Sequence, residues 1–257
     1  MKREASLNEE EPTVRQVASV SRALQMLELL VAHPEHELGV SEMAREIGVV
    51  KSSAHQLLAT LVAHGFVESN TATGRYRLGL RLMEAGAVAA KHFGFGPAVV
   101  PLLEALVAQV HETCSLGVLV GSSVSLVQRV EAESVLRVDL KVGTRFPAHH
   151  SAIGRVIMAG MPPDRLTPMV DSFELSRSER QALLKELDVV RREGCSIVRD
   201  IPVEGISAMA VPVRTSAEPA IAGLVVAAPS FRFNPKAWRG PLFSAAAAIS
   251  ARGDRRL

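Results

Sequence analysis

The sequence predicts an α+β protein made of two domains joined by a helix. Residues 38–67 contain two short amphipathic helices separated by a tight turn, strand-like segments lie at 65–68 and 75–78, and residues 98–257 mix strands with helices. A chain of 257 residues is long enough to bury two hydrophobic cores. We therefore expect a disordered tail at 1–13, an N-terminal domain at 14–78, a linker helix at 79–97 and a second domain at 98–257.

The N-terminal domain is expected to begin with a helix. The charged residues before it, 1–12, have a composition typical of disorder. Ser19 or Ser21 then opens a segment that can form a helix as far as His33-Pro34. Its apolar side chains recur at helical spacing, at Val20, Leu24, Leu27 and Val31.

Residues 38–67 predict a helix-turn-helix. The Ser41 hydroxyl can accept a hydrogen bond from an amide of the first turn, and Gly48 suits the point where the chain leaves helical geometry. The second helix is expected to begin near Lys51. Its apolar stripe follows the helical period and consists of Ala54, Leu57, Leu58, Leu61 and Val62.

The opposite face of this second helix is small, polar and free of acidic residues. Its polar members are Ser52, Ser53, His55, Gln56 and Thr60. Small residues allow close approach to the DNA major groove, where hydroxyl, amide and imidazole groups can meet phosphates and base edges. An ordinary helical hairpin packed in a core would show the same pattern, so this stretch alone leaves both interpretations open.

The next segment favours DNA binding. Strands at 65–68 and 75–78 enclose a turn-rich segment at 70–74, and three helices followed by a hairpin is the order of a winged helix-turn-helix. Arg75, near the hairpin tip, would then contact phosphate or the minor groove. Alternatively, Arg75 and Arg77 are solvated arginines of a hairpin.

The charge balance requires local clustering for any nucleic-acid surface. The formal net charge is +2, and residues 11–80 hold six basic against seven acidic residues. Phosphate attraction must therefore come from cations that the fold brings together. The candidates are Arg45, Lys51, Arg75 and Arg77.

The linker helix is expected over 79–93, and the second domain follows it. We expect helices at 98–112, 151–159, 178–193 and 235–251, strands at 114–120, 124–130, 135–140, 196–199, 207–213 and 220–227, and a loop at 143–147. Strands surrounded by helices over about 150 residues make an α+β domain of ordinary size.

Several classes of protein are disfavoured by composition. No apolar run is long enough to span a bilayer and the N-terminus lacks an apolar signal core, so we expect a cytoplasmic protein without a membrane partner. Cys114 and Cys195 fit no metal spacing and are expected to be reduced, buried thiols. No metal-ligand cluster or phosphate-binding glycine loop appears, so no metal or cofactor is expected.

Several segments resemble the IclR-type bacterial transcription regulators and occur in that family's order. They are SVSRALQMLELL, GVVKSSAHQLLATLVAHGFV, the wing YRLG, VGTRFPAHHSAIGRVIMA and EGISAMAVPVRTSAEPAIAGLVVAAP. The segment at 142–159 looks like the family's Gly-x-x-x-Pro-x-His-x-x-Ala/Gly-x-Gly-Lys/Arg signature. The resemblance covers residues 14–250, nearly the whole chain.

This resemblance implies a winged helix, a linker helix and a GAF-like α/β effector-binding domain, assembled as a homodimer or homotetramer. It implies a sequence-specific regulator, more often a repressor than an activator, whose binding to a double-stranded DNA operator responds to a small organic acid. The implied DNA-facing positions are Ser41, Lys51, Ser52, Ser53 and His55, with Arg75 in the wing. Arg45, Gln56 and Thr60 complete our predicted interface. The family usually has an arginine where this chain has Gln56, which weakens a phosphate contact and can shift which base is read.

Residues 143–154 supply a candidate position for an acid group. Gly143 permits a bend, Pro147 stiffens the approach, and a helix beginning at Ser151 would present its first free amides to a carboxylate or phosphate. The plainer alternative is that Ser151 only caps a structural helix. The resemblance favours the ligand site, for which we predict Val118, Leu119, His149, Ser151, Ala152, Ile153, Val198, Asp200 and Ala208. Arg199 facing inward would favour an acidic ligand, and Asp200 facing inward a hydroxylated one.

Two rival functions stay open at this point. An enzyme with an accessory helix-turn-helix would need a catalytic arrangement around Cys114, His149 and His150, but neither a Cys–His pair nor a Ser–His–Asp set is evident. A DNA-binding protein with a vestigial pocket would instead fill the space near 151–153 with hydrophobic side chains.

Overall fold

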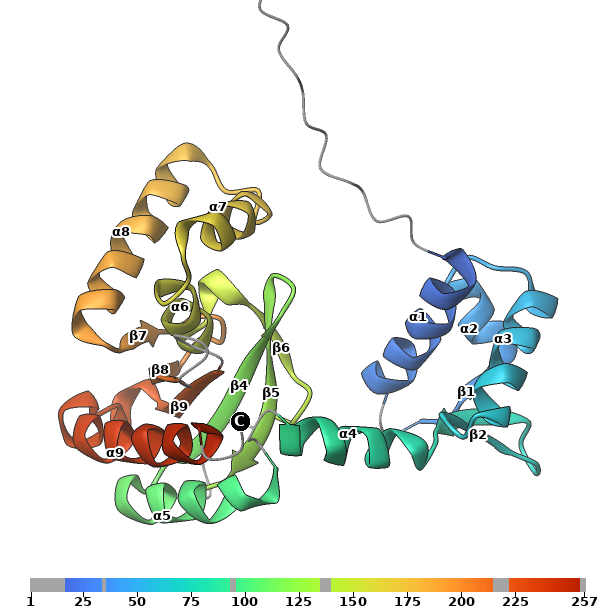
Figure 1. Cartoon of the computed structure of the whole chain (residues 1–257), viewed down its shortest axis with the longest axis horizontal. Coiled ribbons are helices and arrows are strands. Elements are labelled where there is room, and N and C mark those ends of the chain that lie inside the picture. The colour runs from blue at the N-terminus through green and yellow to red at the C-terminus, as the bar shows by residue number, and fades with distance from the viewer. Residues whose placement is uncertain (1–16, 34–35, 93–95, 135–139, 215–221, 255–257) are drawn as a thin grey trace, which may run out of the picture. The chain divides into compact units, whose positions relative to one another are not determined.

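The computed structural model describes residues 17–33, 36–92, 96–134, 140–214 and 222–254. The chain divides into two units, residues 1–87 and 88–257, each with its own internal contacts. The first contains a helix-turn-helix with a β-hairpin, and the second is a sheet with helices on both faces (Figure 1). The α+β class is therefore confirmed. The expected disordered tail at 1–13 lies outside the described residues.

The first unit follows the predicted order of elements. Its helices are α1 (Ala18–Ala32), α2 (Val40–Glu46) and α3 (Lys51–Ala63), and its strands are β1 (Leu38–Gly39), β2 (Val67–Asn70) and β3 (Arg75–Leu78). The strands form an antiparallel sheet in the order β1-β3-β2. Gly48 adopts a positive φ of 68° between α2 and α3, as its position after a helix predicts.

Both predicted serine caps in this unit are wrong. The helix α1 begins at Ala18 after Val17, and no side chain caps it. The helix α2 begins at Val40, one residue before Ser41, because β1 holds Leu38 and Gly39 against β3. The Glu42 carboxylate accepts a hydrogen bond from the Gly39 amide at 3.4 Å, so an acidic side chain in the first turn does the capping.

The core of the first unit lies between the three helices and the hairpin. It contains Met26, Leu30, Leu38, Met43, Ala44, Ala54, Leu58 and Val67. The predicted α3 stripe is thus buried or half-buried. The α1 pattern is different, because Val20, Leu24 and Val31 are more than half exposed, while Met26 and Leu30 are buried.

The helix α4 (Arg81–His92) follows the hairpin, starting two residues later than expected. Its exposed apolar side chains include Met83 and Val88, and Leu80 just before the helix is exposed too. Among the described helices, none is both long and apolar enough to cross a membrane.

The second unit is built on a six-stranded antiparallel sheet in the order β6-β5-β4-β9-β8-β7. The strands are β4 (Thr113–Val120), β5 (Ser123–Val130), β6 (Arg145–Pro147), β7 (Ser196–Arg199), β8 (Ile206–Val213) and β9 (Ala222–Pro229). The helices are α5 (Val100–Val110), α6 (Ala152–Ala159), α7 (Pro163–Asp171), α8 (Arg177–Glu193) and α9 (Pro235–Asp254), and short 3₁₀ turns lie at 97–99, 148–150 and 230–232.

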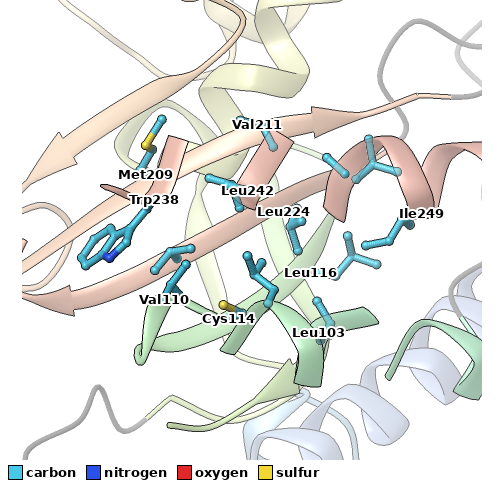
Figure 2. Close-up of a cluster of buried hydrophobic side chains, with 14 of the residues drawn as sticks. Leu103, Val110, Cys114, Leu116, Met209, Val211, Leu224, Trp238, Leu242 and Ile249 are labelled. Carbon is cyan, nitrogen blue, oxygen red and sulfur yellow. The ribbon is translucent and has the colours of Figure 1, made fainter. Parts of the chain in front are cut away.

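The helices α5 and α9 cover one face of this sheet, and a continuous apolar core fills the space beneath them. Figure 2 shows Leu103 from α5 and Leu242 and Ile249 from α9 directed toward Leu116 and Leu224 of the sheet. The helix α6 packs on the other face, with α8 against it (Figure 1).

Two elements of the second domain differ from expectation, and a third expected element lies almost wholly outside the described residues. The predicted loop at 143–147 contains the short edge strand β6, which pairs with β5. The helix α7 was not expected; Pro168 lies inside it, and proline is unfavourable in helix interiors. The strand expected at 135–140 falls almost entirely outside the described residues, and Leu140 itself is not in a strand.

Candidate functional site

The exposed face of α3 presents the polar residues that the sequence singled out. Lys51, Ser52, His55, Gln56 and Thr60 are exposed and Ser53 is half-buried, while Ala54 and Leu58 on the other side are buried. The Thr60 hydroxyl donates a hydrogen bond to the backbone carbonyl of Gln56 at 2.9 Å and is therefore engaged within the helix. The side-chain amide of Gln56 reaches farther from α3 than this hydroxyl does. This face contains no carboxylate.

The adjoining helix α2 adds two further predicted residues. Ser41 and Arg45 are both exposed and lie four residues apart, so they share one face of α2. The structure thus brings a hydroxyl and a cation beside the turn that leads into α3.

Arg75 occupies a different setting from the one expected at a hairpin tip. Its Nε donates to the Glu37 carbonyl at 2.8 Å, and its terminal nitrogen lies 3.1 Å from the Glu42 carboxylate. Arg77 pairs with Glu68 at 2.9 Å. Without DNA, Arg75 helps to join the hairpin to α2. Exposed ion pairs contribute only about 0–1 kcal/mol to stability, so a DNA phosphate can compete with Glu42 for this arginine.

A cavity lies on the face of the sheet that α6 covers. Its volume is about 60 Å³. This volume has room for several water molecules, because one water needs about 10–15 Å³. Five of the predicted effector residues line it, namely Ser151, Ala152, Ile153, Val198 and Ala208.

Two glycines let α6 approach the sheet closely beside this cavity. Gly117 of β4 and Gly223 of β9 are paired across the strands. A Cβ at Gly223 would lie 2.8 Å from the Ile153 side chain, and one at Gly117 would lie 3.0 Å from it. Gly154 lies in α6 itself, where an added Cβ would overlap the backbone of Ala148 in the 3₁₀ turn that precedes the helix. These glycines bring the first turn of α6 to the cavity wall.

Ser151 does cap the helix α6, as its position predicts. Its hydroxyl accepts a hydrogen bond from the Gly154 amide at 2.9 Å and lies 3.3 Å from the Ala148 carbonyl, to which it donates. The amides of Ala152 and Ile153 belong to the opening turn, which has no intrahelical partner for its N–H groups. Capping and a ligand role for this turn are therefore compatible.

The other four predicted effector residues do not line the cavity. Val118 packs into the α5/α9 core, because neighbouring residues of a strand point to opposite faces and Leu119 takes the α6 side. Asp200 accepts hydrogen bonds from the Gly205 amide at 3.0 Å and the Ser230 hydroxyl at 2.8 Å. It therefore holds the segment 201–205, which forms part of the cavity wall. Arg199 does not line the cavity either, since its guanidinium lies 4.7 Å from the centroid of the Phe233 ring, which packs against the α5/α9 core.

His149 does not line the cavity and lies in a small aromatic cluster with His150 and Phe173. Its ring centroid is 4.2 Å from that of Phe173 and 4.0 Å from that of His150. Burial lowers the pKa of His149 from 6.5, and the neighbouring His150 and Arg155 act in the same direction. Its Nδ1 is buried without a hydrogen-bond partner among the described residues.

The arrangement needed for a cysteine-dependent enzyme is not formed. Cys114 lies in the α5/α9 core and His149 on the α6 side of the sheet. Both cysteines are free and buried, as predicted, and burial raises the pKa of each thiol. In the part of the chain that the structure describes, no three His, Cys, Asp or Glu side chains are grouped to hold a metal ion.

Sequence reasoning missed several cavity residues. They are Ser115, Leu126, Arg129, Leu140, Phe146, the segment 201–203, Ile206, Val225 and Ala227. Strand alternation could have found Ser115, since it precedes Gly117 by two residues. Arg129 carried no such signal, because a bulge changes the alternation of β5.

Comparison with known proteins identifies both units. Residues 19–71 match the IclR helix-turn-helix domain, and residues 90–251 match the bacterial transcriptional regulator IclR C-terminal domain. The chain is 32% identical to the glycerol operon regulatory protein of Streptomyces griseus over 86% of this chain and 88% of the relative. It is 30% identical to the transcriptional regulator KdgR of Escherichia coli, with 86% of each chain covered.

A solved structure has the same fold. An IclR homologue from Microbacterium hydrocarbonoxydans, crystallised with 4-hydroxybenzoate, aligns with a TM-score of 0.78 and 23% identity, covering 91% of this chain and 98% of that one. The matched domains extend over most of this chain and include its helix-turn-helix and its cavity-bearing sheet. The chain therefore belongs to the IclR family of DNA-binding transcription regulators, with an N-terminal helix-turn-helix domain and a C-terminal effector-binding domain.

Proposed function

We propose that this regulator binds a roughly palindromic DNA operator as a homodimer and represses transcription until a small organic acid enters the cavity beside α6. The observation that carries the proposal is the exposed, acid-free face of α3 on the same chain as a cavity at a helix N-terminus. A relative named as an operon regulatory protein supports control of transcription at an operator.

The DNA contacts are assigned to two helices and the wing. Ser52, His55 and Gln56 on α3 reach base edges, while Arg45 and Lys51 contact phosphate. Arg75 exchanges Glu42 for phosphate when DNA is bound. Ser41, Ser53 and Thr60 lie at the margin of this surface and position the backbone of the duplex.

The homodimer proposal is supported by exposed apolar side chains. Val17, Val20, Leu24 and Val31 on or beside α1 are 52–63% exposed in the single chain. Contiguous apolar surface of this kind usually marks an interface. Two copies paired through α1 would present two copies of α3 to two operator half-sites.

For the effector to control DNA binding, the protein must bind it with different affinities in the state that can bind DNA and in the state that cannot. The acid would contact the first turn of α6, whose position depends on Gly117 and Gly223. Movement of this turn on binding supplies the two states. A vestigial pocket is disfavoured by the volume that stays open next to Ile153.

The test begins with selection of operator sequences by the full-length protein from a library of random duplexes. Wild-type protein and the Gln56→Ala variant are then compared, with Gln25→Ala on the exposed side of α1 as the control. We expect Gln56→Ala to change the preferred bases and Gln25→Ala to leave them unchanged. Identical preferences in all three proteins would show that α3 is oriented differently.

The assembly is tested by light scattering on Leu24→Glu, with Gln25→Glu as the matched charge control. The proposal expects a dimer for the wild-type protein and the control, and a monomer with much weaker operator binding for Leu24→Glu. A dimer that survives Leu24→Glu would place the interface elsewhere.

A further inference from the structure

Among the described residues that line the cavity, one has a charged side chain and most are apolar. Arg129 of β5 lines it, and only 5% of this side chain is exposed. Apolar side chains around it include Leu126, Phe146, Ile153, Val198 and Val225. A guanidinium cannot be deprotonated in a protein, so this cavity always has a positive charge in its wall. Because the surroundings are apolar, that charge attracts an anion more strongly than it would in water.

A β-bulge directs Arg129 into the cavity. Gly117 pairs with Leu126 but Leu116 pairs with Gln128, so Val127 is an extra residue in β5. Before the bulge, Val124 and Leu126 face α6; after it, Val130 faces the α5/α9 core. Without the extra residue, strict alternation would place Arg129 on the same side as Val127, in the α5/α9 core.

Arg129 makes a polar contact with another residue of the cavity lining. Its Nη1 lies 3.5 Å from the hydroxyl of Ser115, which is 3% exposed and is its partner across the strands. Its Nε lies 3.4 Å from the carboxylate of Glu131, a residue whose side chain is 41% exposed. A bidentate carboxylate would approach the guanidinium to about 2.7–2.9 Å, closer than either of these two contacts.

We infer that Arg129 and Ser115 bind the carboxylate of the effector, and that the effector is a small monocarboxylate with an apolar body. The described wall contains no second cation that could bind the other carboxylate of a dicarboxylate. It also contains few polar groups that could bind the hydroxyls of a sugar acid. A volume near 60 Å³ also favours a small molecule. The inference rests on the proposed effector role of this cavity and assigns its ligand class.

The test measures binding of acid and amide pairs to the full-length protein by calorimetry, without DNA. The pairs are isovalerate with isovaleramide, benzoate with benzamide, and phenylacetate with phenylacetamide. Each amide has the shape of its acid but no charge. The variants are Arg129→Gln, Arg129→Lys and the control Arg199→Gln, which removes an exposed cation outside the cavity.

We expect at least one acid to bind wild-type protein about 10- to 100-fold more tightly than its amide, as a charge-assisted pair gives. Arg129→Gln should abolish this preference, Arg129→Lys should keep part of it, and Arg199→Gln should keep all of it. The wild-type comparison does not depend on the folding of any variant. The inference is overturned if no acid binds better than its amide, or if the preference survives in folded Arg129→Gln.

Failure of this inference can be separated from failure of the proposed function. Operator binding that responds to an uncharged molecule, with no acid preference in calorimetry, would keep effector control and overturn the role of Arg129. Acid binding that depends on Arg129, in a protein that selects no operator sequence, would support the ligand site and contradict the proposed DNA contacts.

Discussion

The α3 surface and the α6 cavity place their functional residues in opposite environments. On α3 the side chains proposed to contact DNA are exposed, and the core of the unit is formed by other residues such as Ala54 and Leu58. At the cavity the residues proposed to bind the effector are themselves buried and belong to the packing of the sheet against α6. Function and stability can therefore be changed separately on α3, whereas at the cavity a change in one should alter the other.

The largest expected effect tests the cavity side of this comparison. In Gly154→Ala, the added Cβ would overlap the Ala148 backbone, which cannot move like a side chain. We expect the free energy of unfolding to decrease by about 3 kcal/mol, a typical upper value for overpacking, and ligand binding to be lost. Thermal unfolding of the full-length protein measures the first effect.

The matched control is Gly240→Ala in α9, where an added Cβ meets no atom within 4 Å. Since alanine is the better helix former, this variant should be more stable by about 0.5–1 kcal/mol. If both glycine variants unfold like the wild-type protein, the first turn of α6 does not pack against the 3₁₀ turn at 148–150 as closely as described.

The second prediction concerns the DNA-facing side. Lys51→Ala should change the free energy of unfolding by less than about 0.5 kcal/mol, because the side chain is exposed at the start of α3. It should weaken binding to all DNA sequences and reduce the slope of log affinity against log salt by about 0.9, the value for one phosphate contact. Lys185→Ala on α8 is the control, and an unchanged slope in Lys51→Ala would remove this residue from the interface.

A third prediction separates a wall-positioning residue from a ligand contact. Asp200 holds the segment 201–205 by accepting hydrogen bonds from Gly205 and Ser230. Asp200→Ala should reduce the free energy of unfolding by about 1 kcal/mol. It should weaken the binding of acids and of amides equally, because the cavity wall at 201–205 loosens while Arg129 stays available to a carboxylate. Asp188→Ala, which breaks an exposed pair with Arg191, should do neither. Selective loss of acid binding would instead make Asp200 part of the anion site.

The smallest expected effect is a pH dependence. Because burial lowers the pKa of His149 in the folded state, the neutral form is favoured there, and folding stability decreases as pH falls below 6.5. His149→Gln should flatten the dependence of the unfolding midpoint on pH between 7 and 5. His150→Gln should flatten the dependence less, because burial lowers the pKa of His149 more than the neighbouring His150 does. Equal slopes in both variants and the wild-type protein would contradict the described burial.

Prediction from sequence succeeded where the signal was local. The apolar stripe of α3, the turn at Gly48 and the capping of α6 by Ser151 each depend on residues within about two helical turns. It failed for Ser41, because the pairing of Leu38 and Gly39 with the distant strand β3 moves the start of α2. It also failed to find that Val20, Leu24 and Val31 are exposed, since periodicity identifies an apolar face but not what covers it.

The two functional regions depend on the chain in different ways. The order of residues within α2 and α3 was sufficient to predict the polar surface of the first unit, since helical periodicity fixes which side chains share a face. The cavity depends on partners that are far apart in sequence: Gly117 with Gly223, Ile153 against both, and Arg129 redirected by one extra residue in β5. Register between strands is a long-range property, and a shift of one residue reverses every side chain, so the charged wall of the cavity could be located only after the sheet was assembled.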